Sequence, residues 1–102
     1  MVLTNLQKNK LKHQIKQILC TQNEIKKVIV FGSFLTSNDP NDIDVAVFQD
    51  SDESYLSLAM KYRKLTRDIS KEIPLDIIPL KVDFSISSFF QEIEDGELIY
   101  EK

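Results

Sequence analysis

The chain has 102 residues, 42% of them hydrophobic and 28% charged, which is typical of one folded domain and excludes collagen-like, low-complexity and disordered classes. We therefore expect residues 1–102 to form a single domain. Its longest apolar runs, such as Val28 to Phe31, are too short for a membrane span or an export signal. The lone Cys20 excludes an internal disulfide, so we expect a cytoplasmic protein.

Charge is distributed unevenly along the chain. Residues 1–27 carry six lysines and one acidic residue, a net +5, whereas residues 28–102 carry seven basic and fifteen acidic residues, a net −8, giving −3 overall. An acidic body argues against direct nucleic-acid binding and suits cations. The lysine-rich start is typical of a solvated helix face, with contact to an acidic partner as the alternative.

The first half of the chain predicts a helix, two strands and a loop. An amphipathic helix opens the chain, because Leu11, Ile15, Ile18 and Leu19 follow helical spacing, and Thr4 with Gln7 forms a capping box at its start. Residues 28–31 form a short apolar strand ended by Gly32. Residues 34–41 form a loop, and residues 43–48 form a second strand.

The second half predicts a long helix, a strand and a last short helix. Apolar positions recur at helical spacing from about 53 to 71, and residues 75–78 form a third strand between two prolines. Ser88 with Gln91 caps a short helix through Ile93, closed by Gly96, and residues 98–100 follow as an apolar tail. The order predicts an α/β or α+β fold, a small mixed β-sheet flanked by helices.

Three aspartates lie beside or inside the apolar strands, although aspartate is disfavoured there. Asp42 and Asp44 flank Ile43, so strand alternation directs both carboxylates to one face. Asp76 lies between Leu75 and Ile77, and it shares that face if the third strand is next to the second. Carboxylates placed so closely favour bound Mg²⁺, and two such ions can assist an in-line phosphoryl displacement.

Gly32-Ser33 forms the other half of the candidate site. A glycine at the end of a buried strand lets the backbone approach a ligand closely, and a helical turn starting at Ser33 would direct free N–H groups towards phosphate. A Gly-Ser pair is common by itself. Its significance comes from its position, with a loop of eight residues between it and Asp42-Ile43-Asp44.

The stretch VIVFGSFLTSNDPNDIDVAVF, followed by IPLDIIPL and the closing GELIYE, resembles the nucleotidyltransferase superfamily related to DNA polymerase beta. More narrowly it resembles the minimal MNT-type proteins, often encoded beside HEPN partners. The resemblance implies a polymerase beta palm-like fold and transfer of a nucleoside monophosphate, with AMP from ATP as first choice, to a hydroxyl of a protein or small molecule. A HEPN-like toxin is the implied partner, with the chain as antitoxin.

The resemblance also implies a role for each motif residue. Gly32 and Ser33 would bind the nucleotide phosphates, and Asp42 and Asp44 would hold Mg²⁺. Asp76 would act as general base and as a ligand of a second metal ion. The site residues are therefore Asp42, Asp44 and Asp76 as catalytic and metal-binding residues, with Gly32 and Ser33 binding phosphate.

The sequence departs from the family pattern in its loop and in its length. The loop FLTSNDPN is short and has no basic residue, which predicts weak catalysis and leaves phosphate charge to metal ions or to Lys61 and Lys81. Larger relatives grip the base or acceptor with a C-terminal helical domain, so we expect a partner to supply acceptor recognition here. Homo-oligomerisation stays open.

Several alternatives remain beside the enzyme. The chain could be an inactive binding module or antitoxin that acts by protein contact, or a nucleotide sensor without turnover. The three aspartates could also be ordinary turn and strand-edge charges. A calcium loop is excluded because NDPNDID has neither the required glycine nor a closing glutamate, and P-loop and dinucleotide fingerprints fail for lack of glycines.

Overall fold

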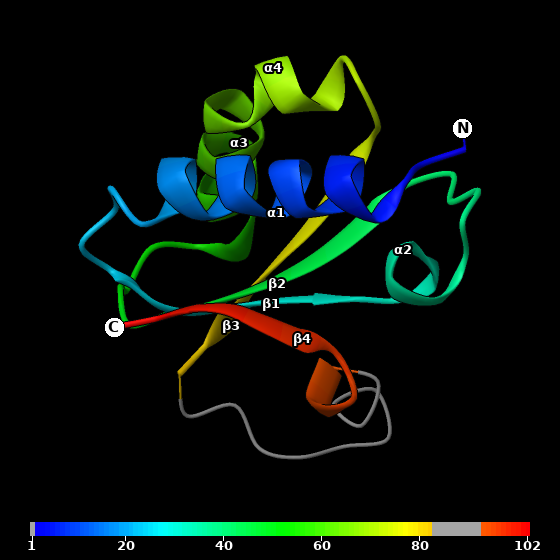
Figure 1. The fold of residues 1–102 in the computed structure, drawn as a ribbon. Coiled ribbons are helices and arrows are strands. Elements are labelled where there is room, and N and C mark those ends of the chain that lie inside the picture. Colours follow the sequence, from blue (N-terminus) through cyan, green and yellow to red (C-terminus); the bar gives the residue numbers. More distant parts are fainter. Residues whose placement is uncertain (1, 83–92) are drawn as a thin grey trace.

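The computed structural model describes residues 2–82 and 93–102, which form a four-stranded mixed sheet with helices on one face (Figure 1). The strands are β1 (Ile25–Phe31), β2 (Ile43–Gln49), β3 (Leu75–Lys81) and β4 (Glu97–Glu101), in the spatial order β3-β2-β1-β4. β1 is antiparallel to β2 and β4, whereas β2 and β3 are parallel. The predicted fold class and the adjacency of the second and third strands are confirmed.

Helix α1 (Asn5–Leu19) begins with the predicted capping box. The Gln7 backbone N–H donates to Thr4 Oγ1 at 3.1 Å, and the Thr4 N–H donates to Gln7 Oε1 at 2.8 Å. Leu11, Ile15 and Leu19 are buried, as the helical spacing predicts. No helix in the described ranges is long and apolar enough to cross a membrane.

The long helix predicted over residues 53–71 is interrupted. Helix α3 spans Tyr55–Leu65 and α4 spans Arg67–Ser70, with Thr66 between them. The buried Thr66 hydroxyl donates to the Tyr62 carbonyl at 2.8 Å, and the Thr66 backbone leaves helical geometry at φ −99° and ψ 13°. A side-chain bond to the carbonyl four residues earlier is a known cause of helix bending.

The C-terminal end also differs from the prediction. Residues 98–100, predicted as an apolar tail, belong to strand β4, which pairs with β1. Gly96 lies so close to β1 that an added Cβ would be 2.6 Å from the Val30 carbonyl oxygen, so only glycine fits there. The predicted cap at Ser88 and Gln91 lies outside the described residues.

Side chains from the two faces of the sheet form separate apolar clusters. The larger cluster fills the space under α1 and α3 and includes Ile15, Val30, Val45 and Ile77. The smaller one, on the opposite face, joins Phe31, Ala46 and Phe48 to Ile93. Figure 1 shows α1, α3 and α4 on one side of the sheet and the short turn that precedes β4 on the other. The face without long helices is the one that carries the candidate site.

Candidate functional site

The Gly32 turn ends β1 and starts the short helix α2 (Ser33–Thr36). Gly32 has φ +83° and ψ −160°, a conformation almost restricted to glycine. A Cβ on Gly32 would be only 2.4 Å from Asp44 Oδ2. Glycine is therefore required twice, for its backbone angles and for the close approach of the Asp44 carboxylate. Gly32 and Ser33 are both exposed, so the turn is open to a ligand.

Asp44 and Asp76 are brought together by strand register. Asp44 is paired with Phe31 on β1 and with Asp76 on the parallel strand β3. Alternation places Asp44 on the face of Ala46 and Phe48, and Asp76 on the face of Ile78 and Leu80, which is the same face of the sheet. Gly32, Asp44 and Asp76 thus lie in a row across three neighbouring strand ends.

Asp42 lies one residue before β2 and is half-buried. It is two residues from Asp44, as the sequence motif requires. Among residues 2–82 and 93–102, no three His, Cys, Asp or Glu side chains are grouped so that they could hold a metal ion by themselves. Asp44 and Asp76, which are register partners on β2 and β3, are the acidic residues that the sheet places next to each other, with Asp42 two residues before Asp44 along the chain.

The two lysines expected to balance phosphate charge lie elsewhere. Lys81 is at the end of β3 far from Asp76, where its Nζ donates to the Ser51 carbonyl oxygen. Lys61 Nζ is 2.9 Å from Glu24 Oε2, just before β1 begins. Because β1 is antiparallel to β2, the start of β1 is at the opposite end of the sheet from Asp44. The expectation for Lys61 and Lys81 was therefore wrong.

Two adjoining cavities lie beside the Gly32 turn. The smaller, of 340 Å³, is lined by Gly32, Leu35, Thr36 and Asp95. The larger, of 590 Å³, shares Leu35 and Asp95 with it and continues to α1; its other lining residues are Asn5, Lys8, Asn9, Lys12, Phe34, Gly96 and Glu97. Sequence reasoning did not place α1 and residues 95–97 near the turn, since only the tertiary fold brings them there.

Both lysines of the larger cavity already have partners. Lys8 Nζ donates to the Ser37 carbonyl oxygen and lies 5.5 Å from the centroid of the Phe34 ring. Lys12 Nζ is 2.8 Å from Glu97 Oε2. These contacts hold α1 against α2 and β4. They make the cavity wall a mixture of cations, carboxylates and amides instead of a purely basic surface.

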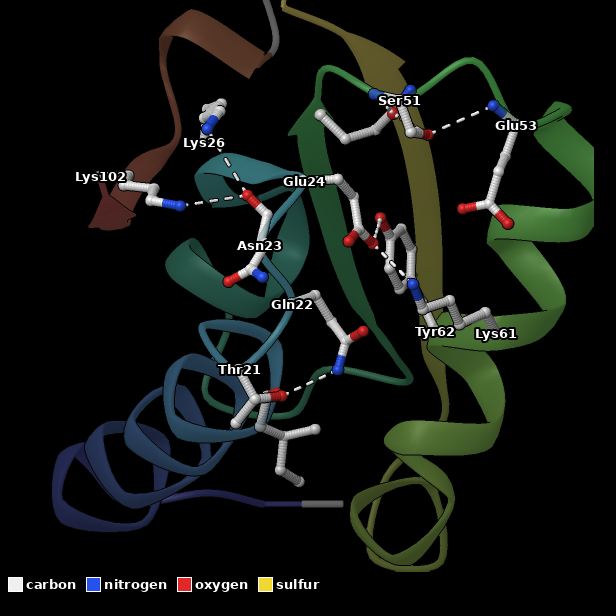
Figure 2. Close-up of polar contacts among 12 residues, drawn as sticks. Thr21, Gln22, Asn23, Glu24, Lys26, Ser51, Glu53, Lys61, Tyr62 and Lys102 are labelled. Carbon is white, nitrogen blue, oxygen red and sulfur yellow. Dashed lines mark hydrogen bonds and ion pairs between the residues drawn. The ribbon is translucent and has the colours of Figure 1, made fainter.

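A separate polar cluster lies at the other end of the sheet and involves Glu24, Lys61 and Tyr62 (Figure 2). Glu24 Oε2 accepts hydrogen bonds from Lys61 Nζ and from the Tyr62 hydroxyl, each at 2.9 Å. Partial burial would raise the pKa of Glu24, but hydrogen bonds from Lys61, from the backbone and from Tyr62 outweigh it and hold this pKa below its ordinary value. Burial and the bond to Glu24 raise the pKa of Tyr62. A protonated, buried tyrosine tied to a carboxylate joins α3 to the start of β1.

A comparison with protein families matches residues 13–102 to the family described as Polymerase beta, Nucleotidyltransferase. The match includes the Gly32 turn and all three aspartates. A comparison with curated proteins finds no match.

Solved structures of similar fold include two toxin–antitoxin complexes. One contains a tri-AMPylated HEPN toxin of Shewanella oneidensis with MNT antitoxin, at 17% identity and a TM-score of 0.62, covering 93% of this chain and 73% of that one. The toxin–antitoxin pair MntA–HepT gives 15% identity and a TM-score of 0.59, covering 92% of this chain and 73% of that one. A protein of Sulfolobus solfataricus, provisionally described as a nucleotidyltransferase, gives 17% identity and a TM-score of 0.57, covering 95% of this chain and 83% of that one. At these identities the likeness shows the fold.

Proposed function

The chain belongs to the polymerase beta nucleotidyltransferase family, and from that premise we propose that it transfers a nucleoside monophosphate, AMP from ATP in the first instance, to a hydroxyl group. The observation that carries the proposal is the contact between Gly32 and Asp44, with Asp76 in register beside them. The backbone angles of Gly32 are almost restricted to glycine, which adopts them without a clash, and the missing Cβ lets the backbone approach the Asp44 carboxylate closely.

The donor set fits Mg²⁺ bound together with a nucleotide. In proteins Mg²⁺ is usually held by one or two carboxylates, with water and substrate phosphates completing the shell, and not by a cage of protein ligands. Asp42 and Asp44 would hold the first ion and Asp76 would contribute to a second, on the exposed side of the Gly32 turn. When bound, the metal supplies charge neutralisation for the phosphate groups.

The chain's own groups then have distinct tasks. The Gly32 and Ser33 backbone and the Ser33 hydroxyl would bind the terminal phosphates of the nucleotide. The acceptor hydroxyl oxygen attacks the α-phosphorus, the bond to the β-phosphate oxygen breaks, and pyrophosphate leaves. The hydroxyl proton passes to the Asp76 carboxylate, which is exposed at the start of β3 and so accessible to an acceptor.

We infer a protein acceptor from the same family setting. The Shewanella complex contains an AMPylated HEPN toxin with MNT antitoxin, and MntA–HepT is likewise a toxin–antitoxin pair. By analogy, this chain would modify and neutralise a HEPN-like toxin.

The second candidate is an antitoxin that acts by contact alone. One observation favours it: the loop between α2 and β2 has no basic residue, and Lys61 and Lys81 are engaged at the far end of the sheet. Under this alternative, the double variant Asp42→Asn with Asp44→Asn still neutralises its toxin. Loss of neutralisation in that variant would count against it.

The test of transferase activity uses the chain, α-labelled ATP, Mg²⁺ and the product of the neighbouring gene as acceptor. We expect label on the acceptor, with transfer abolished by chelation and by Asp44→Asn. Ser51→Ala is the matched control, because Ser51 is bonded to Gln49 at the other end of β2. Absence of label with the wild type, or equal label with Asp44→Asn, would refute the proposal.

A further inference from the structure

The outer face of α3 exposes two large apolar side chains four residues apart. Leu56 is 66% exposed and Met60 is 61% exposed, whereas Leu58, Ala59 and Tyr62 on the inner face are buried. Residues four apart lie on the same side of a helix, so Leu56 and Met60 form one continuous apolar strip. Adjoining large apolar side chains on a surface mark an interaction site more often than scattered ones do.

The strip continues into three exposed cations. Arg63 and Lys64 follow Met60 at three and four residues, and Arg67 starts α4 directly afterwards. Within the part of the chain that the structure describes, none of these three side chains has an ion-pair partner. Such a cluster stands out because residues 28–102 as a whole carry a net −8. We call Leu56, Met60, Arg63, Lys64 and Arg67 together the α3 face.

The α3 face leads towards the candidate site. Helix α3 follows the far end of β2, and the chain then passes through α4 to the start of β3, where Asp76 lies. Helix α4, which starts at Arg67, thus connects the α3 face to the start of the edge strand β3 (Figure 1). A protein bound along α3 could extend around this edge to the site.

We propose that the α3 face docks a partner protein through an amphipathic helix, whose apolar stripe covers Leu56 and Met60 and whose carboxylates face the cations. The spacing of Leu56 and Met60 along one side of α3 suits a partner helix. An acidic partner follows from three cations that have no ion-pair partner among the described residues, on an otherwise acidic body. Nucleic acid suits this face less, since two of its five side chains are apolar and the rest of the chain carries a net negative charge that repels phosphate. The inference rests on the proposed function only for the partner's identity, a toxin-like protein that carries the acceptor hydroxyl.

The test measures complex formation directly, in the absence of ATP and Mg²⁺. The probe is the purified product of the neighbouring gene, titrated calorimetrically with the wild type and with Met60→Ser/Lys64→Glu. The matched control is Leu6→Ser/Lys10→Glu, which likewise changes an exposed large apolar residue and a lysine four residues later, on the surface of α1. We expect at least about tenfold weaker binding for the first variant, and less than about twofold change for the control. Wild-type binding should weaken as salt is raised.

Four results would overturn the inference: absence of binding by the wild type, equal binding by both double variants, a wild-type dimer that Met60→Ser/Lys64→Glu makes monomeric, and stronger binding of RNA than of the protein probe. Arg63→Glu alone should repeat the loss, which guards against a folding defect in the double variant. Asp44→Asn separates the two proposals: it should lose transfer but keep the complex, so docking and catalysis can fail independently.

Discussion

Substitution of Gly32 by alanine should damage the site through a single methyl group. The added Cβ would lie 2.4 Å from Asp44 Oδ2, and ordinary contact begins at 3.4 Å, so the carboxylate must move by 1.0 Å or the turn must open. Alanine must also adopt φ +83° with ψ −160°, which costs about 1–3 kcal/mol. For a domain of this size, that lowers the midpoint of thermal unfolding by about 10 °C.

The expected effect on transfer is larger than the effect on stability. A misplacement of about 1 Å at a reacting centre can cost about a hundredfold in rate. Thermal unfolding gives the stability change, and transfer of labelled nucleotide, measured well below the unfolding midpoint, gives the rate. Both should fall together in Gly32→Ala.

Gly96→Ala is the matched control for this experiment. Its Cβ would be 2.6 Å from the Val30 carbonyl oxygen and 2.9 Å from Phe31 Cβ, so it disturbs the pairing of β1 with β4 instead of the Asp44 carboxylate. We expect a comparable loss of stability with transfer much closer to that of the wild type. If Gly32→Ala were as stable and as active as the wild type, the reasoning from the Gly32–Asp44 contact would be refuted.

Further predictions concern the polar cluster and the general base. Tyr62→Phe removes the 2.9 Å bond to Glu24 while Lys61 stays bonded, so the free energy of unfolding in urea should drop by about 1–2 kcal/mol; an unchanged midpoint would contradict this. Because the pKa of Glu24 is lowered from 4.5, its contribution is present above that pH and lost as pH falls further, so Glu24→Gln should flatten the acid limb of the stability profile. The raised pKa of Tyr62 has the opposite effect on the pH dependence: its contribution to stability is fully present below pH 10.0 and is lost as pH rises. Tyr62→Phe should therefore flatten the alkaline limb of the stability profile, and an unchanged alkaline limb would argue against this role. Asp76→Asn should slow transfer by about 10²–10⁴-fold, while ATP affinity measured by calorimetry stays within a few fold.

Local sequence signals predicted the parts of the fold that depend on neighbours along the chain. The capping box at Thr4, the turn at Gly32 and the alternation around Asp44 each involve residues within three positions of one another. The adjacency of Asp76 and Asp44 was a conditional prediction, and it is confirmed because β2 and β3 pair in parallel. The catalytic and metal-binding roles of these residues stay predictions.

The features that were missed depend on tertiary contacts. Thr66 interrupts the long helix because its buried hydroxyl bonds to the Tyr62 carbonyl, and nothing in the helical spacing signals that burial. Residues 97–101 form a strand because they pair with the edge of β1. The strand propensity of a short segment cannot show that such an edge is available to it. Lys61 was assigned to phosphate, but its partner Glu24 is 37 residues away in the sequence.

The register of β3 determines whether a site exists at all. Ile77 is 1% exposed and is paired with Val45 over the larger apolar cluster, so its burial keeps Asp76 on the opposite face, beside Asp44. A slip of one residue would bury the Asp76 carboxylate under the helices and expose Ile77, at a cost of several kcal/mol for the unpaired charge alone. The same apolar contacts that stabilise the sheet therefore select the only alternation in which Gly32, Asp44 and Asp76 share a face. For this reason, substitutions in the core under α3 should affect transfer as well as stability, even though they touch none of these residues.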